Sequence, residues 1–233
     1  MKRVLSSIFV ASSLLLGSTL ASVSYAADAA PAKPDAKKGE QLFVNGDAAR
    51  GILACASCHG AAGNSTIPTN PNLAAQSHEY LAKQLGDFRS KDGKQPPLRR
   101  GVNGANTVMT TFASQLTPED MQNIALYLSQ QKLDYDKAAT ATNEATMELG
   151  QKIWRGGIDE RRVPACAACH SANGAGLPGE FPRLAGQFPS YIAEQLKLFR
   201  SGDRANGEMM HDIADRMSDS EIAAVADYAA GLR

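Results

Sequence analysis

Two five-residue motifs in the sequence, Cys55 to His59 and Cys166 to His170, each place a histidine directly after a C-x-x-C pair. In such a C-x-x-C-H motif the thiols can add across the vinyl groups of a porphyrin, and the imidazole can bind the iron from one side. The two motifs contain every cysteine of the chain: Cys55, Cys58, Cys166 and Cys169. The sequence therefore predicts two covalently bound haems of c type, with His59 and His170 each supplying one axial iron ligand.

A C-x-x-C pair can also be a redox dithiol, a disulfide or half of a zinc site. A four-thiolate zinc site usually has its two pairs closer together in sequence, and a thioredoxin-like dithiol lies in a βαβ context that this sequence lacks. The histidine after each pair and the matching surroundings of the two motifs favour haem.

The chain contains an internal repeat. Shifting the sequence by 111 residues places the second motif on the first and extends the match on both sides. The matched positions include glycines, a proline and a run of polar and apolar residues: Gly39 with Gly150, Phe43 with Trp154, Pro71 with Pro182, Gln76 with Gln187, Tyr80 with Tyr191, Gln84 with Gln195 and Phe88 with Phe199.

The offset then falls to 101, where Met109 meets Met210 and Tyr127 meets Tyr228. The first half thus has a loop about ten residues longer, which includes the polar segment 91–100. We interpret this basic loop as solvent-exposed, with contact to an acidic partner as the alternative.

The clear secondary-structure signals are helical. Thr117 and Ser218 each precede an acid by three residues and an apolar i, i+3, i+4, i+7 pattern, which predicts a capped amphipathic helix at the end of each half. Further helices are expected from near Ser77 and Ser190, and before each motif, ending around Phe43 and Trp154. No alternating strand is evident, so we expect an all-α fold. Its domains are 35–131 and 147–233, and residues 132–146 form a polar linker.

The repeat also sorts the candidates for the second axial ligand, since equivalent haems should take ligands from equivalent positions. His78 lies opposite Pro189 and His211 opposite Thr110, so neither histidine has a counterpart. Among the methionines only Met109 and Met210 superpose, and we predict that they are the axial ligands. The neighbouring Met209 is the main alternative on the second haem. Thioether ligation opposite histidine raises the reduction potential.

Two prolines, Pro71 and Pro182, each follow the motif histidine by twelve residues. A carbonyl group on that turn could accept the imidazole N–H and fix the orientation of the ring. An ordinary rigid turn is the alternative interpretation.

Residues 1–26 have the features of a cleaved signal peptide. Lys2 and Arg3 precede an apolar, serine-rich stretch, and Ser24 to Ala26 offers small residues for cleavage. A retained anchor is less favoured, because the stretch is short and interrupted by serines. Export to the periplasm suits thioether formation, and any membrane association of the mature protein would be peripheral.

Charge argues against a nucleic-acid partner. The full chain has 24 basic and 24 acidic residues, and removal of residues 1–26 takes away two basic ones and leaves a balance of −2. Haem propionates would make the protein more acidic still, whereas proteins that bind nucleic acids carry basic surfaces.

Together, the doubled motif, the segments 70–76 and 181–187, and the methionines before the Thr117 and Ser218 caps resemble the dihaem cytochrome c4 family. The resemblance covers most of the chain, from about Gly39 to Leu232. It implies two tandem class I cytochrome c domains related by pseudo-twofold symmetry, with haem propionates near the domain interface. Carried over by position, it implies thioethers at Cys55, Cys58, Cys166 and Cys169, and axial ligands at His59, Met109, His170 and Met210.

The resemblance also implies a function, that of a periplasmic electron carrier rather than an enzyme. Such a carrier passes electrons from a bc1-type donor toward a terminal oxidase, and takes protein redox partners rather than a small-molecule substrate. Two alternatives stay open. One is the cytochrome subunit of a flavoprotein dehydrogenase, such as sulfide dehydrogenase. The less favoured one is a dihaem peroxidase-type enzyme, in which one haem would lack its sixth ligand.

Overall fold

The computed structural model describes residues 33–233, so the expected signal peptide, residues 1–26, lies outside the described part of the chain. Within that part the fold is helical, and extended pairing is limited to isolated bridges. None of the helices between residues 33 and 233 is both long and apolar enough to cross a membrane. The expectation of an all-α fold is confirmed.

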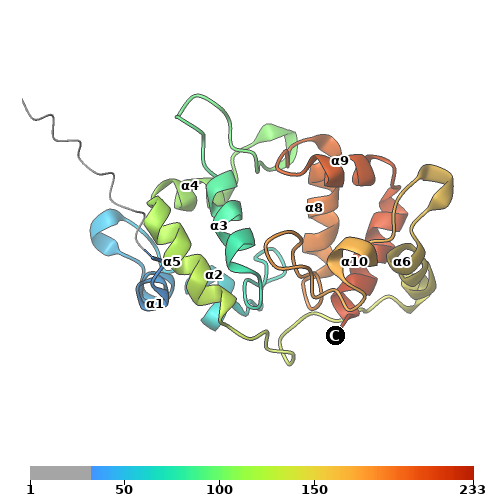
Figure 1. Ribbon diagram of the computed structural model, residues 1–233, viewed down its shortest axis with the longest axis horizontal. Coiled ribbons are helices and arrows are strands. Elements are labelled where there is room, and N and C mark those ends of the chain that lie inside the picture. Colours follow the sequence, from blue (N-terminus) through green and yellow to red (C-terminus); the bar gives the residue numbers. More distant parts are fainter. Residues whose placement is uncertain (1–32) are drawn as a thin grey trace, which may run out of the picture. The chain divides into compact units, whose positions relative to one another are not determined.

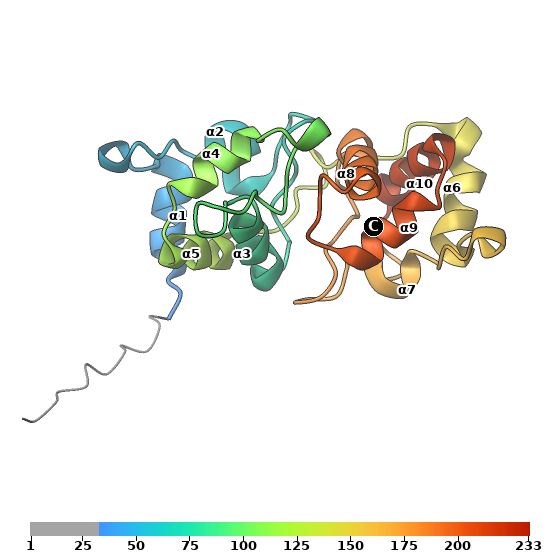
Figure 2. The same ribbon diagram turned by 90° about the horizontal axis from the view of Figure 1, so that it is seen from above.

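Each half repeats the same helices in the same order, and the colours of Figures 1 and 2 separate into a blue-to-green half and a yellow-to-red half. The first half consists of α1 (Ala36–Asn45), α2 (Ala56–His59), α3 (His78–Asp87), α4 (Val108–Ser114) and α5 (Pro118–Ser129). The second half consists of α6 (Glu144–Gly156), α7 (Ala167–His170), α8 (Pro189–Ser201), α9 (Glu208–Asp215) and α10 (Asp219–Gly231).

The predicted capping boxes are present at the last helix of each half. The Thr117 hydroxyl accepts the backbone N–H of Asp120, whose carboxylate accepts the N–H of Thr117, and Ser218 and Glu221 repeat this exchange. These bonds satisfy backbone donors that a helix N-terminus otherwise leaves free. The helix before each motif extends to Asn45 and Gly156, two residues beyond its predicted end, and α6 begins at Glu144, inside the expected linker.

The core of each half forms where the last helix crosses the first, α5 against α1 and α10 against α6. The aromatic residues of the repeat meet at these crossings. The rings of Phe43 and Tyr127 lie 5.7 Å apart, and those of Trp154 and Tyr228 lie 6.4 Å apart. Phe43 and Trp154 are fully buried. Apolar burial of these large rings thus stabilises both halves in the same way.

The longer loop of the first half is divided in two, which the sequence comparison at fixed offsets did not show. Arg99 donates its backbone N–H to Asp87, and Arg204 donates to Leu198, the residue equivalent to Asp87. Arg99 and Arg204 are therefore equivalent, and their separation is 105 residues. Six extra residues lie before Arg99 (111 minus 105), and four lie between it and Met109 (105 minus 101).

Pseudo-twofold symmetry between the halves is visible in their buried polar contacts. The Gln187 side chain accepts the backbone N–H of Asn72 and donates to its carbonyl, each at 2.9 Å. Gln76 makes the same exchange with the backbone of Arg183, at 3.0 and 2.7 Å. Asn72 and Arg183 are equivalent, as are Gln76 and Gln187, so the contacts are reciprocal, as a twofold relation requires.

The crossing of α1 and α5 predicts a stability difference between two glycine substitutions. A Cβ atom at Gly39 would lie 2.0 Å from the Asn123 carbonyl oxygen, whereas one at Gly86 in α3 would meet nothing within 4 Å. We expect Gly39→Ala to lower the free energy of unfolding by about 1–3 kcal/mol, because the helices must separate.

Gly86→Ala is the matched control, since its equivalent, Lys197, already carries a side chain. We expect this control to raise the free energy of unfolding by about 0.5–1 kcal/mol. Guanidinium titration of the holoprotein compares the two variants. Equal stabilities for them would contradict close packing at this crossing.

Candidate haem-binding site

Each C-x-x-C-H motif forms a single helical turn. The backbone N–H of His59 donates to the Cys55 carbonyl at 3.0 Å, and that of His170 donates to the Cys166 carbonyl at 2.9 Å. None of the four cysteines forms a disulfide. Because the turn is closed, both thiols and the imidazole of a motif border the same cavity.

The motif histidines are oriented by the prolines that follow them twelve residues later. The Nδ1 atom of His59 lies 3.0 Å from the Pro71 carbonyl oxygen, and that of His170 lies 2.9 Å from the Pro182 carbonyl oxygen. The predicted contact between imidazole and carbonyl is thus confirmed in both halves. A proton on Nδ1 bonded to a carbonyl leaves the lone pair of Nε2 available to a metal.

Burial keeps these groups in their uncharged forms. Desolvation lowers the pKa of His59 and of His170, although the hydrogen bond to the proline carbonyl opposes the shift. Burial also raises the pKa of Cys55 and of Cys166 to about 11. A neutral imidazole is the form that ligates iron, whereas a reactive dithiol requires a thiolate, which burial opposes here.

The predicted methionine ligands lie on two short helices that the sequence did not reveal, α4 and α9. Met109 and Met210 are half-buried. The residues before them, Val108 and the rival ligand Met209, are equivalent to each other and are 71 % and 57 % exposed. Val108 and Met209 also border the cavity, but both are more exposed than Met109 and Met210, which favours Met210 over Met209 as the ligand.

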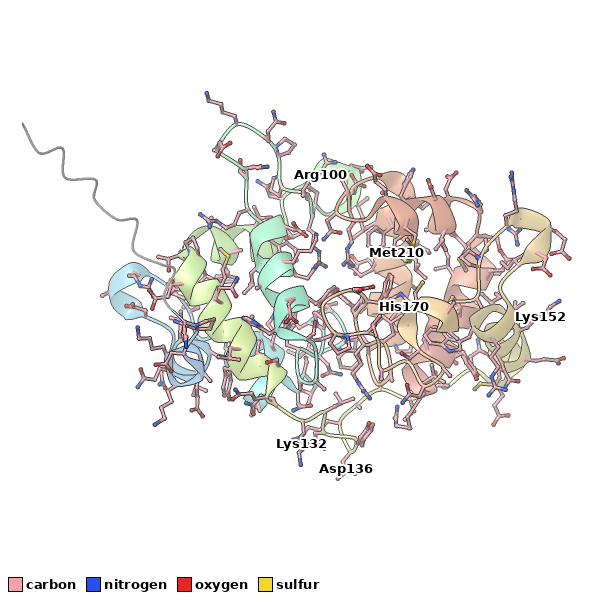
Figure 3. All side chains as sticks on the ribbon, viewed as in Figure 1. Arg100, Lys132, Asp136, Lys152, His170 and Met210 are labelled. Carbon is pink, nitrogen blue, oxygen red and sulfur yellow. The ribbon has the colours of Figure 1, made fainter. Side chains whose placement is uncertain are left out.

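A cavity of about 710 Å³ brings the predicted residues together. Its lining contains all eight of them: Cys55, Cys58, His59, Met109, Cys166, Cys169, His170 and Met210. His170 and Met210, labelled in Figure 3, approach it from α7 and α9. Neither His78 nor His211 lines the cavity, in agreement with their lack of counterparts in the repeat.

The residues around the cavity fit a haem group. Large apolar side chains of both halves line it, including Leu81, Phe112, Ile192 and Leu196. Arg100, labelled in Figure 3, also lines it and has a buried Nε atom without a hydrogen-bond partner. An apolar cavity with an unpaired buried donor suits a macrocycle that carries carboxylates. Between residues 33 and 233 no three His, Cys, Asp or Glu side chains cluster as a metal site.

The cavity is also lined by polar residues for which the sequence alone indicates no role. Tyr80, Gln84 and their equivalents Tyr191 and Gln195 line the cavity together with Arg99 and Arg204. The tyrosine and the glutamine recur at the same offset of 111 residues in both halves, and this repetition could have marked them as residues of the site. The sequence comparison did not pair the two arginines, because the divided loop separates them by 105 residues rather than by 111 or 101.

Comparison with known proteins agrees with this geometry. The family model described as cytochrome c matches residues 36–132 and 147–232. Cytochrome c4 of Stutzerimonas stutzeri is 39 % identical over 195 residues, which cover 80 % of this chain and 90 % of that protein. Cytochrome c4 of Azotobacter vinelandii is 37 % identical over 194 residues, with the same coverage of both chains.

Among solved structures, reduced recombinant cytochrome c4 from Pseudomonas stutzeri superposes with a TM-score of 0.69 at 34 % identity, covering 86 % of this chain and 100 % of that chain. The two tandem domains, the two C-x-x-C-H motifs and these matches identify the cofactors as two covalently bound haem c groups. The chain belongs to the cytochrome c family, as an electron carrier of the dihaem cytochrome c4 type.

Proposed function

We propose that the protein carries electrons in the periplasm, from a bc1-type donor toward a terminal oxidase, with His59 and Met109 as the axial ligands of the first haem and His170 and Met210 as those of the second. The observation that carries this proposal is the cavity lined by both matched pairs. The proposed domains are residues 35–131 and 147–233, joined by the linker 132–146, and follow residues 1–26 as a cleaved signal peptide.

The chain's own residues support one-electron chemistry by holding the site rigid. Each haem, when bound, supplies an Fe(III)/Fe(II) couple. The proline carbonyls of Pro71 and Pro182 hold the imidazoles, and the helices α4 and α9 present the thioethers. With His59 and Met109 holding one iron and His170 and Met210 the other, no open site for a substrate would remain, which favours a carrier over a peroxidase-type enzyme. A thioether opposite histidine favours the reduced state and raises the potential.

A second candidate function differs in the electron donor. A protein of Stutzerimonas stutzeri named thiosulfate dehydrogenase electron acceptor is 36 % identical over 200 residues, covering 84 % of this chain and 87 % of that protein. A structure of thiosulfate dehydrogenase from Marichromatium purpuratum superposes with a TM-score of 0.72 at 33 % identity, covering 84 % of this chain and 40 % of that one. These relatives support a dehydrogenase of reduced sulfur compounds as an alternative donor. The flavoprotein dehydrogenase alternative has no comparable support among them.

The ligand assignment predicts the spectra and potentials of methionine variants. Met109→Ala and Met210→Ala should each remove part of the weak far-red band of Fe(III)–thioether bonding and lower one of the two reduction potentials. Optical redox titration of the holoproteins measures both effects. Met209→Ala is the matched control and should retain the band and both potentials.

A variant of Met109 or Met210 that changes neither band nor potential would mean that its haem is ligated otherwise or open. A peroxidase-type activity would then be the one to pursue. Loss of the band in Met209→Ala would move the ligand of the second haem by one residue.

The two candidate donors predict different reduction kinetics. If the bc1-type donor is correct, the oxidised protein should be reduced rapidly by a bc1 complex with quinol and reoxidised by a terminal oxidase. Thiosulfate dehydrogenase with thiosulfate should then reduce it only slowly. Stopped-flow absorption at a haem band compares the two donors at equal concentration and ionic strength. Faster reduction by the dehydrogenase would establish the second candidate instead.

A further inference from the structure

His211 follows the predicted ligand Met210 directly on α9, but its side chain contacts α8 instead of the cavity. The Nδ1 atom of His211 lies 2.7 Å from the backbone carbonyl oxygen of Phe199. A carbonyl group only accepts hydrogen bonds, so Nδ1 is the donor. His211 does not line the cavity. Its imidazole therefore joins two helices and is not a candidate ligand of the iron.

The Phe199 carbonyl is free for this bond because it lies in the last turn of α8. The last carbonyl groups of a helix have no partner further along the helix. α8 ends at Ser201, and the backbone N–H of Gly202 donates to the Phe199 carbonyl at 3.1 Å. The imidazole N–H is a second donor at the negative end of the helix dipole. The bond thus ties α9 to the end of α8.

Phe199 also lies beside the methionine that α9 presents. A Cβ atom at Gly207, the residue before α9, would lie 3.3 Å from the Cε1 atom of Phe199 and 3.8 Å from the Cβ atom of Met210. Phe199 and Met210 both line the cavity, and α9 packs against α8. Movement of α9 away from α8 would therefore withdraw Met210 from the cavity.

The first half holds its methionine helix differently. Thr110 takes the place of His211, and its hydroxyl accepts the backbone N–H of Thr107 at 3.2 Å, while the Thr107 hydroxyl accepts that of Thr110. These bonds cap α4 on itself, whereas α9 follows Gly207, which has no side chain to do so. Among residues 33–233, α4 also has no packing with α3 comparable to that of α9 with α8. The contact with α8 is therefore particular to α9.

We propose that His211 is a positioning residue of the second haem, whose bond to the Phe199 carbonyl holds α9 against α8 and so keeps Met210 on the iron. The inference rests on the proposed ligation by Met210. An external ligand can bind the iron only while the thioether is detached, so its apparent affinity rises with the detached fraction. Loss of one hydrogen bond should raise that fraction about two- to tenfold.

The test is a titration of the oxidised holoprotein with imidazole, followed through the far-red thioether band. A Met109→Ala background leaves this band to the second haem alone. In that background His211→Phe keeps a ring without a donor, and it should lower the imidazole concentration that removes half of the band by about two- to tenfold. His211→Asn keeps an amide N–H near the position of Nδ1 and should retain the concentration of its parent.

The controls separate the hydrogen bond from packing and from effects elsewhere. A role in packing alone would reverse the order, with the phenylalanine variant close to its parent and the asparagine variant impaired, and this result overturns the inference. In a Met210→Ala background, where the band belongs to the first haem, His211→Phe should have no effect. His78→Gln removes the other histidine outside the cavity, and as the matched control it should leave the imidazole titration of either haem unchanged.

The band before imidazole is added separates this inference from the ligand assignment. A Met109→Ala protein without the band overturns the assignment, and the inference with it. A band that is present and equally resistant to imidazole in His211→Phe and its parent overturns the inference alone and leaves the carrier unaffected. An equal effect of His211→Phe on the first haem also overturns it. If His211→Phe yields no folded holoprotein, His211→Ala decides by the same criterion.

Discussion

The hydrogen bond between each motif histidine and a proline carbonyl is the constraint around which the rest of each half is arranged. It links a helical turn that holds two thiols to a chain segment twelve residues further on. One imidazole nitrogen is thereby committed to the protein and the other is left for iron. The helix crossings, with their buried aromatic rings, then hold this unit against the last helix of the half.

Much of this could be predicted from the sequence, because the chemistry is written in short local signals. The C-x-x-C-H motifs, the Pro71 and Pro182 spacing and the Thr117 and Ser218 caps each require only a few neighbouring residues. The match of Met109 with Met210 needed one more step, a comparison of the halves. In the structure, all four cysteines, both motif histidines and both of these methionines line the cavity.

Other features depend on contacts that local signals do not encode. The helices α4 and α9 are too short to show a clear apolar period, and their position depends on packing around the cavity. The equivalence of Arg99 and Arg204 is recognisable only from their backbone hydrogen-bond partners, Asp87 and Leu198, in the structure. A divided insertion leaves no constant offset in sequence, although the fold preserves the equivalence of these backbone bonds.

The reciprocal side-chain amide contacts between the halves determine which groups a half produced alone would expose. Gln76 and Gln187 each occupy the backbone of the opposite half, and Asp203 accepts the backbone N–H groups of Asn103 and Gly104 across the same boundary. A half produced alone would expose these donors and acceptors on a surface built to be covered. Deletion of one half would therefore leave these backbone groups to hydrogen-bond with water instead of with the other half.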